Sequence, residues 1–412
     1  MPLPNFFKLI IWSSIYLIAS TSAAQSYVVK GLREADLEFT KKNYAIALET
    51  YTFYQGSDIS NDYLNQQIAL CYFHLRHFEN AMNSFGLVKS IVPTIQIDYV
   101  KCMMANEKYA EVKAYISQHK ESLDSAFIHL SLSCDSALSW QKNNKGTAYN
   151  IGMANSSYSD IAPSPYESGI VFCSNRRGLK IEKNSEIDGN PLYDLYFISA
   201  AGKGWSSPSL FSTRLNSTDH EGPVCFNSNN DTVYFSRNEE ASLQPHLKMY
   251  RSIKTGRQWG KPQNFMLNDT SASFAHPSIS GDGKIFFFTS DMKGGFGGTD
   301  IYACILIDSS WSMPINLGSN INTSGNEVFP FVNKEGHLYF ASEGHLGMGG
   351  YDVFISTQQE GMWQTAQNLK SPVNTGADDF AYTESKEGKV YFTSNRKGGK
   401  GNDDIYTFES IK

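Results

Sequence analysis

Residues 294–302 read Gly-Gly-Phe-Gly-Gly-Thr-Asp-Ile-Tyr, and the chain repeats this text nearly unchanged at residues 347–354 and 398–406. The aspartates of the three copies, Asp300, Asp352 and Asp404, lie 52 residues apart. Upstream, Lys248 stands 52 residues before Asp300 in a matching segment, and Asp194 stands 54 residues before Lys248. A fixed period of this size is typical of propeller blades of four strands. The sequence therefore predicts five such units.

Each unit has the same internal order of turns and short apolar runs. Asp282-Gly283 lies between two such runs, a dipeptide that favours a tight hairpin because glycine accepts a positive φ. The third predicted strand of a unit is followed by a tryptophan, and these residues are Trp205, Trp259, Trp311 and Trp363. Four short strands per unit, with loops that repeat so closely, indicate a radial propeller rather than a sandwich.

The last unit ends after Phe408 without a fourth strand. Residues 148–156 resemble the fourth-strand text of residues 316–323. We therefore expect the ring to close by pairing this N-terminal strand with the last blade, which removes an open sheet edge. The predicted propeller spans residues 146–412.

The preceding residues, 25–141, show a helical pattern. Tyr44 and Ala47 recur as Phe78 and Ala81, at an offset of 34 residues. That offset is the tetratricopeptide (TPR) period, in which small and aromatic residues pack paired helices. We expect these four residues to be packing positions of a TPR-like α-solenoid. The predicted fold class is α+β and multidomain, with this solenoid followed by an all-β five-bladed propeller.

Residues 1–24 have the order of a secretory signal peptide: Lys8, an apolar run over residues 9–19, and Ser22-Ala23-Ala24 before the expected cleavage point. The run is shorter than the ~20 residues of a spanning helix, so no membrane-spanning segment is expected after cleavage. The six cysteines are widely scattered and are interpreted as small buried hydrophobes. A bridge between Cys71 and Cys102 is the alternative.

Charge and motifs restrict the classes of function. Lys and Arg number 35 against 41 Asp and Glu, which gives a net charge of −6 and argues against a nucleic-acid partner. The sequence contains no nucleophile elbow, zinc-protease motif, phosphate loop or C-x-x-C pair. We therefore expect a protein that is not an enzyme, with no catalytic, cofactor-binding or metal-binding residues. Paired carboxylates on different blades are the alternative that local motifs would not reveal.

The repeated aspartates allow two interpretations. Carboxylates beside glycine turns can bind calcium, or they can accept hydrogen bonds from the backbone of the turn. We favour the second, because Lys248 replaces the aspartate in one unit and no D-x-D-x-D spacing supplies further oxygens. The expected structural residues of the repeat are the four tryptophans together with Asp194, Asp300, Asp352 and Asp404.

The blade text of residues 277–284, 288–291, 300–302 and 311–323 resembles the TolB-type WD40-like propeller repeat. With the TPR-like segment before it, the chain is similar to the OmpA-family cell-envelope proteins of Bacteroidetes, which include a TPR-propeller component of the type IX secretion system. Those proteins typically continue into an OmpA-like peptidoglycan-binding domain, whereas this chain ends at Lys412. Contact with peptidoglycan is therefore expected to be only indirect.

The resemblance implies a non-enzymatic scaffold or adaptor in the periplasm, associated with the outer membrane, whose partners are outer-membrane or secretion-system proteins. Type IX secretion or gliding machinery is the specific expectation. The alternative is a propeller that binds or cleaves a glycan or peptide, which requires acidic or aromatic groups at the central opening. A structural role in the outer membrane is a third interpretation.

Overall fold

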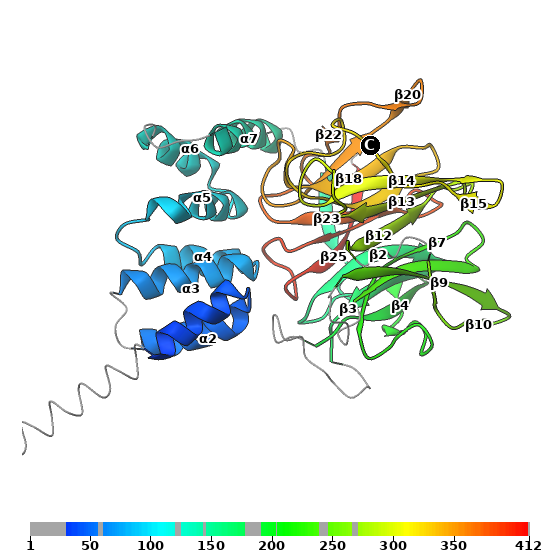
Figure 1. Ribbon diagram of the computed structural model, residues 1–412, viewed down its shortest axis with the longest axis horizontal. Coiled ribbons are helices and arrows are strands. Elements are labelled where there is room, and N and C mark those ends of the chain that lie inside the picture. Colours follow the sequence, from blue (N-terminus) through cyan, green and yellow to red (C-terminus); the bar gives the residue numbers. More distant parts are fainter. Residues whose placement is uncertain are drawn as a thin grey trace, which may run out of the picture. The chain divides into compact units, whose positions relative to one another are not determined.

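A computed structural model describes residues 30–56, 61–119, 125–142, 146–177, 191–202, 204–238, 246–265 and 271–410. The expected signal peptide lies outside these residues. Within them, seven helices precede a five-bladed β-propeller (Figure 1), which confirms the predicted α+β class with two parts. The described part of the chain falls into two compact units, one up to residue 99 and the other from residue 100 onward. No helix among the described residues is long and apolar enough to span a bilayer.

The helices alternate with short turns. Residues 30–40 are helical, and the later helices are α2 (Tyr44–Gln55), α3 (Asp62–His74), α4 (Phe78–Phe85), α5 (Gln96–Ala105), α6 (Tyr109–Gln118) and α7 (Ser125–Gln141). A single 3₁₀ turn, η1 (Pro93–Ile95), precedes α5. Within the first unit α3 packs against both α2 and α4, and within the second unit α6 packs against α7.

A repeated turn marks the start of every second helix. Lys42, Arg76 and Glu107 have φ of 66°, 63° and 57°, and each lies two residues before the first residue of α2, α4 or α6. Left-handed backbone is uncommon for residues other than glycine, so its recurrence at offsets of 34 and 31 residues shows the repeat directly.

The expected packing residues of the helices are buried to different degrees. Ala47 and Ala81 are fully buried, and Phe78 is 8% exposed. Tyr44 is half-buried, and its ring stacks on that of His74 with centroids 4.4 Å apart. Small side chains at residues 47 and 81 leave room for a neighbouring helix to approach closely.

Four strands build each blade, and in blades 1–4 a short outer hairpin extends the third. Blade 1 contains β2 (Asp160–Tyr166), β3 (Gly169–Ser174), β4 (Asp194–Ala201), the hairpin strand β5 (Gly204–Trp205) and β6 (Ser209–Leu210). Blade 2 contains β7 (His220–Phe226), β8 (Thr232–Asn238), β9 (Leu247–Thr255), the hairpin strand β10 (Gln258–Trp259) and β11 (Gln263–Asn264). All of the pairings are antiparallel.

The remaining blades follow the same plan. Blade 3 contains β12 (Phe274–Ile279), β13 (Ile285–Ser290), β14 (Asp300–Ile307), the hairpin strand β15 (Ser310–Trp311) and β16 (Ile315–Asn316). Blade 4 contains β17 (Glu327–Val332), β18 (Leu338–Ser342), β19 (Asp352–Ser356), the hairpin β20 (Gln358–Gln359) and β21 (Met362–Trp363), and β22 (Gln367–Asn368). Blade 5 contains β23 (Asp379–Glu384), β24 (Val390–Ser394) and β25 (Asp404–Ser410).

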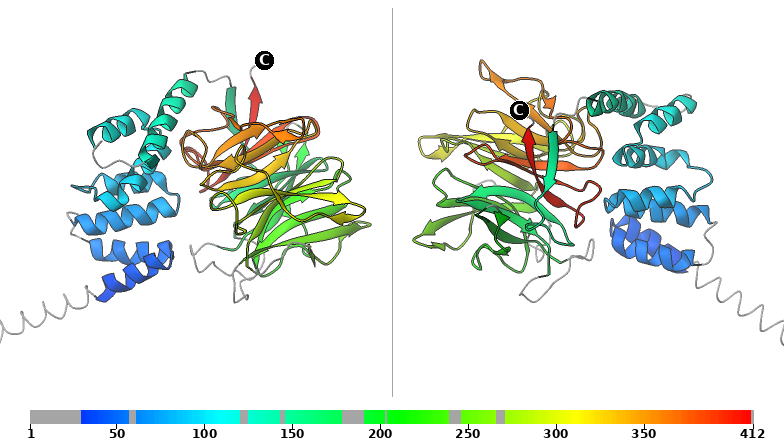
Figure 2. Two further views of the ribbon diagram at one scale, coloured as in Figure 1. Left: turned by 45° about the horizontal axis from the view of Figure 1, so that its top comes forward. Right: turned by 180° about the vertical axis from the view of Figure 1, so that it is seen from behind.

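The fourth strand of blade 5 comes from the start of the propeller. Strand β1 (Gly146–Asn150) pairs antiparallel with β25, with Gly146 opposite Ser410 and Asn150 opposite Tyr406 (Figure 2). The innermost strands β2, β7, β12, β17 and β23 each contact the next, and β23 contacts β2. The ring is therefore closed by both ends of the propeller sequence.

Buried asparagines fasten each segment that links one blade to the next. The Asn374 side chain accepts a hydrogen bond from the Val353 N–H (2.8 Å) and donates one to the Val353 carbonyl oxygen (2.9 Å). Three more asparagines grip the third strand of the preceding blade in the same two-point way: Asn155 on Ile405, Asn216 on Leu195 and Asn322 on Ile301. Residue 268, which occupies the corresponding place before blade 3, lies outside the described residues.

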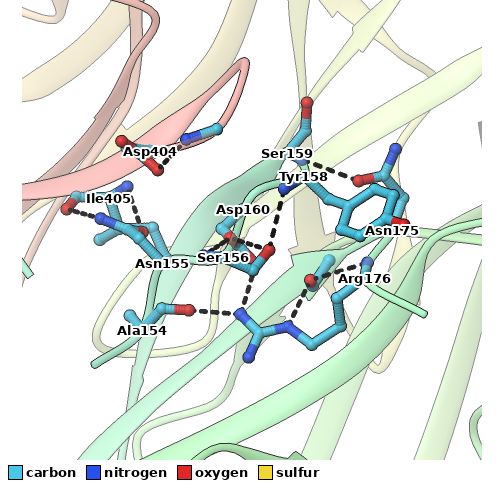
Figure 3. A network of polar contacts seen from close by, with 12 residues as sticks. Ala154, Asn155, Ser156, Tyr158, Ser159, Asp160, Asn175, Arg176, Asp404 and Ile405 are labelled. Atoms are coloured by element: carbon cyan, nitrogen blue, oxygen red, sulfur yellow. Dashed lines mark hydrogen bonds and ion pairs between the residues drawn. The ribbon is translucent and has the colours of Figure 1, made fainter. Parts of the chain in front are cut away.

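The residue after each of these asparagines is bonded to the following blade. The Ser156 N–H and hydroxyl donate to the Asp160 carboxylate at 2.5 and 2.8 Å (Figure 3). The Asp160 N–H donates to the Asp403 carbonyl oxygen of blade 5. The same arrangement recurs for Ser217 with Glu221, Thr323 with Glu327 and Thr375 with Asp379. Each link is thus bonded to the blade behind it and to the blade ahead.

Three of these fully buried carboxylates also pair with an arginine. Arg396 Nη2 lies 2.6 Å from Asp379 Oδ1, and its guanidinium stacks over the Tyr406 ring at 5.0 Å. Arg176 with Asp160 and Arg237 with Glu221 repeat the pair. Blade 3 differs, because Phe274 occupies the register position of the carboxylate and the half-buried Met292 the place of the arginine. We call the position of this pair in each blade the joint. In blade 3 the joint is therefore built from apolar side chains.

We expect Asn374→Ala to lower the free energy of unfolding of the propeller by about 2–4 kcal/mol, since it leaves the buried Val353 N–H without a partner and removes one of the two hydrogen bonds to the Val353 carbonyl oxygen, which keeps that from the Leu369 N–H. The change is measured by urea unfolding followed by near-ultraviolet circular dichroism. Asn264→Ala is the matched control, because Asn264 is exposed. Equal losses in both variants would contradict this role of Asn374.

The pair in blade 5 can be tested against the apolar joint of blade 3. Arg396→Met alone leaves the Asp379 carboxylate buried without its counter-charge, and we expect a loss of about 3–5 kcal/mol in the free energy of unfolding. The double variant Asp379→Phe with Arg396→Met copies blade 3 and should lose less than the sum of the two single variants, by at least about 1 kcal/mol. Simple additivity in this double-mutant cycle would refute the equivalence of the two joints.

Candidate functional site

A cavity of about 310 Å³ lies on the axis of the propeller. All five innermost strands, β2, β7, β12, β17 and β23, contribute to its lining, together with the turns that follow β7, β12, β17 and β23. Its volume falls at the lower end of the range of small-ligand sites, about 300–1,000 Å³. It is the site to which every blade contributes, which makes it the principal candidate for recognition.

A β-bulge shapes the lining part of every innermost strand. In β12 the pairing passes from Ala275 opposite Thr289 to Ser278 opposite Phe287, so the inner strand carries one extra residue. The other four innermost strands shift register at the same place. Four bulge residues have positive φ near 50°, namely Ala162, His276, Phe329 and Ala381. A bulge re-aims the strand locally, so these residues line the cavity.

Prolines follow the bulges and change what the cavity wall can bind. Pro163, Pro223, Pro277 and Pro330 each come directly after the bulge position and line the cavity. These strands are sheet edges, and proline has no N–H with which to extend a hydrogen-bonded ladder. The wall is therefore unsuited to regular strand addition and is suited to recognition through side chains.

An aromatic row forms one side of the cavity. The rings of His276 and Phe329 stack with centroids 3.8 Å apart, and Phe329 lies 5.1 Å from the neighbouring Phe380 ring. The Phe329 N–H donates to His276 Nδ1 (3.4 Å). Burial lowers the pKa of His276 to about 3, so its imidazole is neutral and carries its proton on Nε2.

Polar groups gather at the end of the cavity where the strands turn. The Tyr382 hydroxyl donates to Glu384 Oε1 (2.8 Å), and Asn333 Nδ2 lies 3.3 Å from Glu384 Oε2. The Tyr382 ring stacks on Tyr339 at 4.3 Å. Burial, with the nearby charge of Glu384, raises the pKa of Tyr382 and raises that of Tyr339 to about 12. Both phenols are thus hydrogen-bond donors at neutral pH, and Tyr382 helps to hold Glu384 in place.

One lysine spans this end of the cavity. Lys386 Nζ donates to the Ser228 carbonyl oxygen at 2.9 Å, and this bond joins blade 5 to blade 2, which are not neighbours in the ring. Glu384 is the single carboxylate among the lining residues. The usual glycosidase arrangement needs two carboxylates about 5–10 Å apart. As arranged, the lining residues can accept a cationic or N–H group at Glu384 and pack apolar groups against the aromatic row.

The repeat aspartates of the sequence analysis lie elsewhere, at the starts of third strands. Asp300 accepts hydrogen bonds from the N–H groups of Phe296 (2.6 Å) and Gly297 (3.3 Å). Asp352 and Asp404 are bonded to their own glycine loops in the same way. Burial nevertheless raises the pKa of these two carboxyls. Asp194 starts β4 and is half-buried.

The repeat tryptophans lie on the outer hairpins and contact the blade before. Trp259 packs against Phe211 of blade 1 with centroids 5.8 Å apart, and Trp205 packs against Tyr391 of blade 5 at 6.1 Å. Trp363 contacts Phe287 of blade 3, and Trp311 contacts Phe265 of blade 2. None of the repeat aspartates or tryptophans lines the axial cavity.

The described part of the chain shows neither a metal-binding cluster nor a disulfide bond. No cluster of three or more His, Cys, Asp or Glu side chains there could hold a metal ion. All six cysteines are free thiols, including Cys71 and Cys102, whose burial raises their pKa to about 12. The alternative bridge between these two cysteines is therefore absent.

Sequence reasoning did not identify the cavity residues as a site. His276, Phe329, Tyr382 and Glu384 belong to no local sequence motif. A usable signal was present: proline is the fourth residue of four innermost strands, at residues 163, 223, 277 and 330. Proline inside an apolar run marks a bulge or an edge strand, and edges of five blades meet on the axis.

Comparisons with known proteins give likenesses of fold alone. No family model and no curated protein matches the chain. A solved structure of a putative TolB from Agrobacterium tumefaciens is 16% identical, covers 65% of this chain and 91% of its own, and has a TM-score of 0.37. A gluconolactonase from Xanthomonas campestris is 11% identical, with coverage of 65% and 95% and a TM-score of 0.37. A thermostable family-43 glycoside hydrolase is 14% identical, with coverage of 62% and 90% and a TM-score of 0.41.

These structures correct one expectation from the sequence. The absence of local catalytic motifs led to the prediction that the chain is not an enzyme. Structures with a similar fold include a gluconolactonase and family-43 glycoside hydrolases, so that exclusion is wrong. The physical reason is that a propeller can assemble a catalytic set from separate blades, which leaves no contiguous motif in the sequence.

The lowered pKa of His276 predicts a pH effect on stability. Between about pH 6.5 and pH 3 the unfolded chain binds a proton at this residue that the folded chain does not, so the stabilising contribution is lost as the pH falls. His276→Asn keeps an acceptor and tolerates positive φ. We expect the free energy of unfolding of the wild type to decline more steeply than that of this variant from pH 7 to pH 4. Parallel declines would show that His276 does not titrate in this way.

Proposed function

We propose that the propeller is the recognition module of an envelope-associated adaptor, and that it binds a segment of a partner protein in the axial cavity. The observation that carries the proposal is the combination within this cavity of an aromatic row at His276 and Phe329 with a single, firmly held carboxylate at Glu384. Ligand sites are typically apolar with a few fixed polar groups.

The polar end of the cavity favours a peptide with a basic group. The Glu384 carboxylate already accepts bonds from Tyr382 and Asn333, and it can accept a further bond from a lysine, an arginine or an amino terminus. An apolar neighbouring residue of the peptide would then pack against Phe329. The ligand would displace or bypass the Lys386 bond to Ser228 to enter from this end.

We also propose a role for the helical part of the chain, a location for the protein and a class of partners. The helix pairs, with small buried residues at 47 and 81 and a turn that repeats after 34 and 31 residues, support a TPR-like module that offers a second binding surface. We place the protein in the periplasm, associated with the outer membrane, where its partners would be outer-membrane or secretion-system components. Type IX secretion or gliding machinery is the specific proposal, on the resemblance described above.

Site-specific photocrosslinking tests the proposal. A benzophenone amino acid replaces Phe329 in the full exported chain, and a second variant carries it at Met313, which is 83% exposed in the segment between β15 and β16 of blade 3. After irradiation in the native envelope, mass spectrometry identifies the attached peptides. We expect one protein segment to be attached at residue 329 and not at residue 313.

The crosslinked segment then supplies the peptide for a binding measurement. Glu384→Gln should weaken its affinity by about tenfold, because a charge-assisted hydrogen bond contributes about 1.5–3 kcal/mol. Asp282→Asn, which alters an exposed carboxylate in a turn of blade 3 outside the cavity lining, is the control. Absence of any specific adduct at residue 329, or equal adducts at both residues, would overturn the proposal.

A further inference from the structure

A second groove lies between blades 1 and 2 and shares no lining residue with the axial cavity. Its volume is about 350 Å³, and we call it the cationic groove. Blade 1 contributes the β2–β3 turn, β4 and the segment after β6, and blade 2 contributes the outer hairpin that runs from β9 into β10. It is lined by Tyr166, Glu167, Phe197, residues 211–214, Lys254 and residues 257–259.

The cationic groove can be compared with the corresponding groove between two other blades of the same propeller. Blades 3 and 4 form an equivalent groove of about 490 Å³, in which Trp363 takes the place of Trp259. No charged residue lines the groove between blades 3 and 4. The positions of the three cations are occupied there by neutral residues: Asn320 for Arg214, Gln358 for Lys254 and Gly361 for Arg257. The groove between blades 3 and 4 is built around its tryptophan and apolar residues without any cation. The blade fold therefore does not require the three cations of the cationic groove.

One backbone contact shows that the two grooves are equivalent. Arg214 Nη1 donates to the Trp259 carbonyl oxygen at 3.4 Å, and Asn320 Nδ2 donates to the Trp363 carbonyl oxygen at 2.8 Å. The shorter asparagine fulfils this structural role with better geometry. The additional length and charge of Arg214 therefore call for a different explanation.

The charges of the cationic groove are only partly neutralised. Lys254 Nζ bonds to Glu167 Oε1 (3.0 Å) and to the Tyr166 hydroxyl (2.6 Å), and it lies over the Trp259 ring. Among the described residues, no carboxylate forms an ion pair with Arg214 or Arg257, and both side chains are exposed. The groove therefore presents, next to aromatic side chains, two guanidinium groups that have no ion-pair partner in the described part of the chain, and the net charge of the whole sequence is negative.

We propose that the cationic groove binds an organic oxyanion, in which a carboxylate or phosphate group is attached to an apolar or ring-shaped group. The guanidinium groups of Arg214 and Arg257 would hold the oxyanion, since their planar forks of N–H donors match both carboxylate and phosphate. The attached group would lie against Phe197 and Phe211, which are half-buried and line the groove.

Three small probes distinguish the possible sources of the anion. N-acetyl-phenylalanine supplies a carboxylate on an aromatic group, phenyl phosphate supplies a phosphate, and N-acetyl-phenylalanine amide is the uncharged counterpart. Binding to the full chain is followed through the indole N–H signals of the tryptophans by nuclear magnetic resonance at constant ionic strength. Trp259→Phe assigns the signal of Trp259.

We expect at least one anionic probe to shift the Trp259 signal saturably while the Trp363 signal stays in place, and the amide to bind at least tenfold more weakly. The preferred anion then identifies the carboxylate or the phosphate as the source. In Arg214→Ala with Arg257→Ala the affinity should fall at least tenfold, whereas Lys261→Ala should retain it. Lys261 is exposed two residues after Trp259 and does not line the groove, so it controls for a general loss of positive charge.

Three results would overturn the proposal. These are an absence of any Trp259 shift with both anions at 20-fold molar excess and millimolar concentration, equal binding of the amide, and unchanged affinity in the double arginine variant. Arg214 and Arg257 are exposed, so their replacement leaves the core intact, and an unchanged set of the other tryptophan signals verifies folding. These measurements report on the cationic groove alone, so they would be unchanged if the axial cavity did not bind a peptide.

Discussion

The hydrogen bonds at the links between blades determine the geometry on which the rest of the propeller depends. A buried asparagine such as Asn374 grips the backbone of the third strand behind it, and the next residue, Thr375, is bonded to the Asp379 carboxylate of the blade ahead. The asparagine at one end of such a link and the carboxylate that receives the other end are both buried, where an unmade hydrogen bond is costly. Closure by β1 uses the same device, with Asn155 on Ile405.

Fixed blade positions decide what lies on the axis. The five innermost strands are held as sheet edges around one cavity, and in four of them the bulge sets the side chain of a left-handed residue against that space. The prolines after the bulges remove N–H donors from these edges, which leaves recognition to side chains such as Phe329 and Glu384. Rigid blades with variable inner residues separate the requirements of stability from those of binding.

Divergence among the five blades shows which residues the fold needs and which it does not. The arginine–carboxylate joint of blade 5 is replaced in blade 3 by Phe274 and Met292 without loss of the blade geometry. Conversely, the groove between blades 1 and 2 has acquired Arg214 and Arg257 where its counterpart has neutral residues. Comparison of repeats within one chain thus separates structural positions from candidates for recognition.

The sequence by itself determined the five blades and the alternation of helices, because period, turn residues and strand patterning are local properties that each repeat carries. Local spacing also marked the glycine loop around Asp300, whose carboxylate bonds to backbone N–H groups within a few residues. Only the tertiary structure decided the sites. Glu384, His276 and Ser228 are far apart in the chain and meet on the axis only after ring closure. The Arg214 and Arg257 pair likewise depends on the contact of two adjacent blades, and contacts of that kind leave no periodic signal in a sequence.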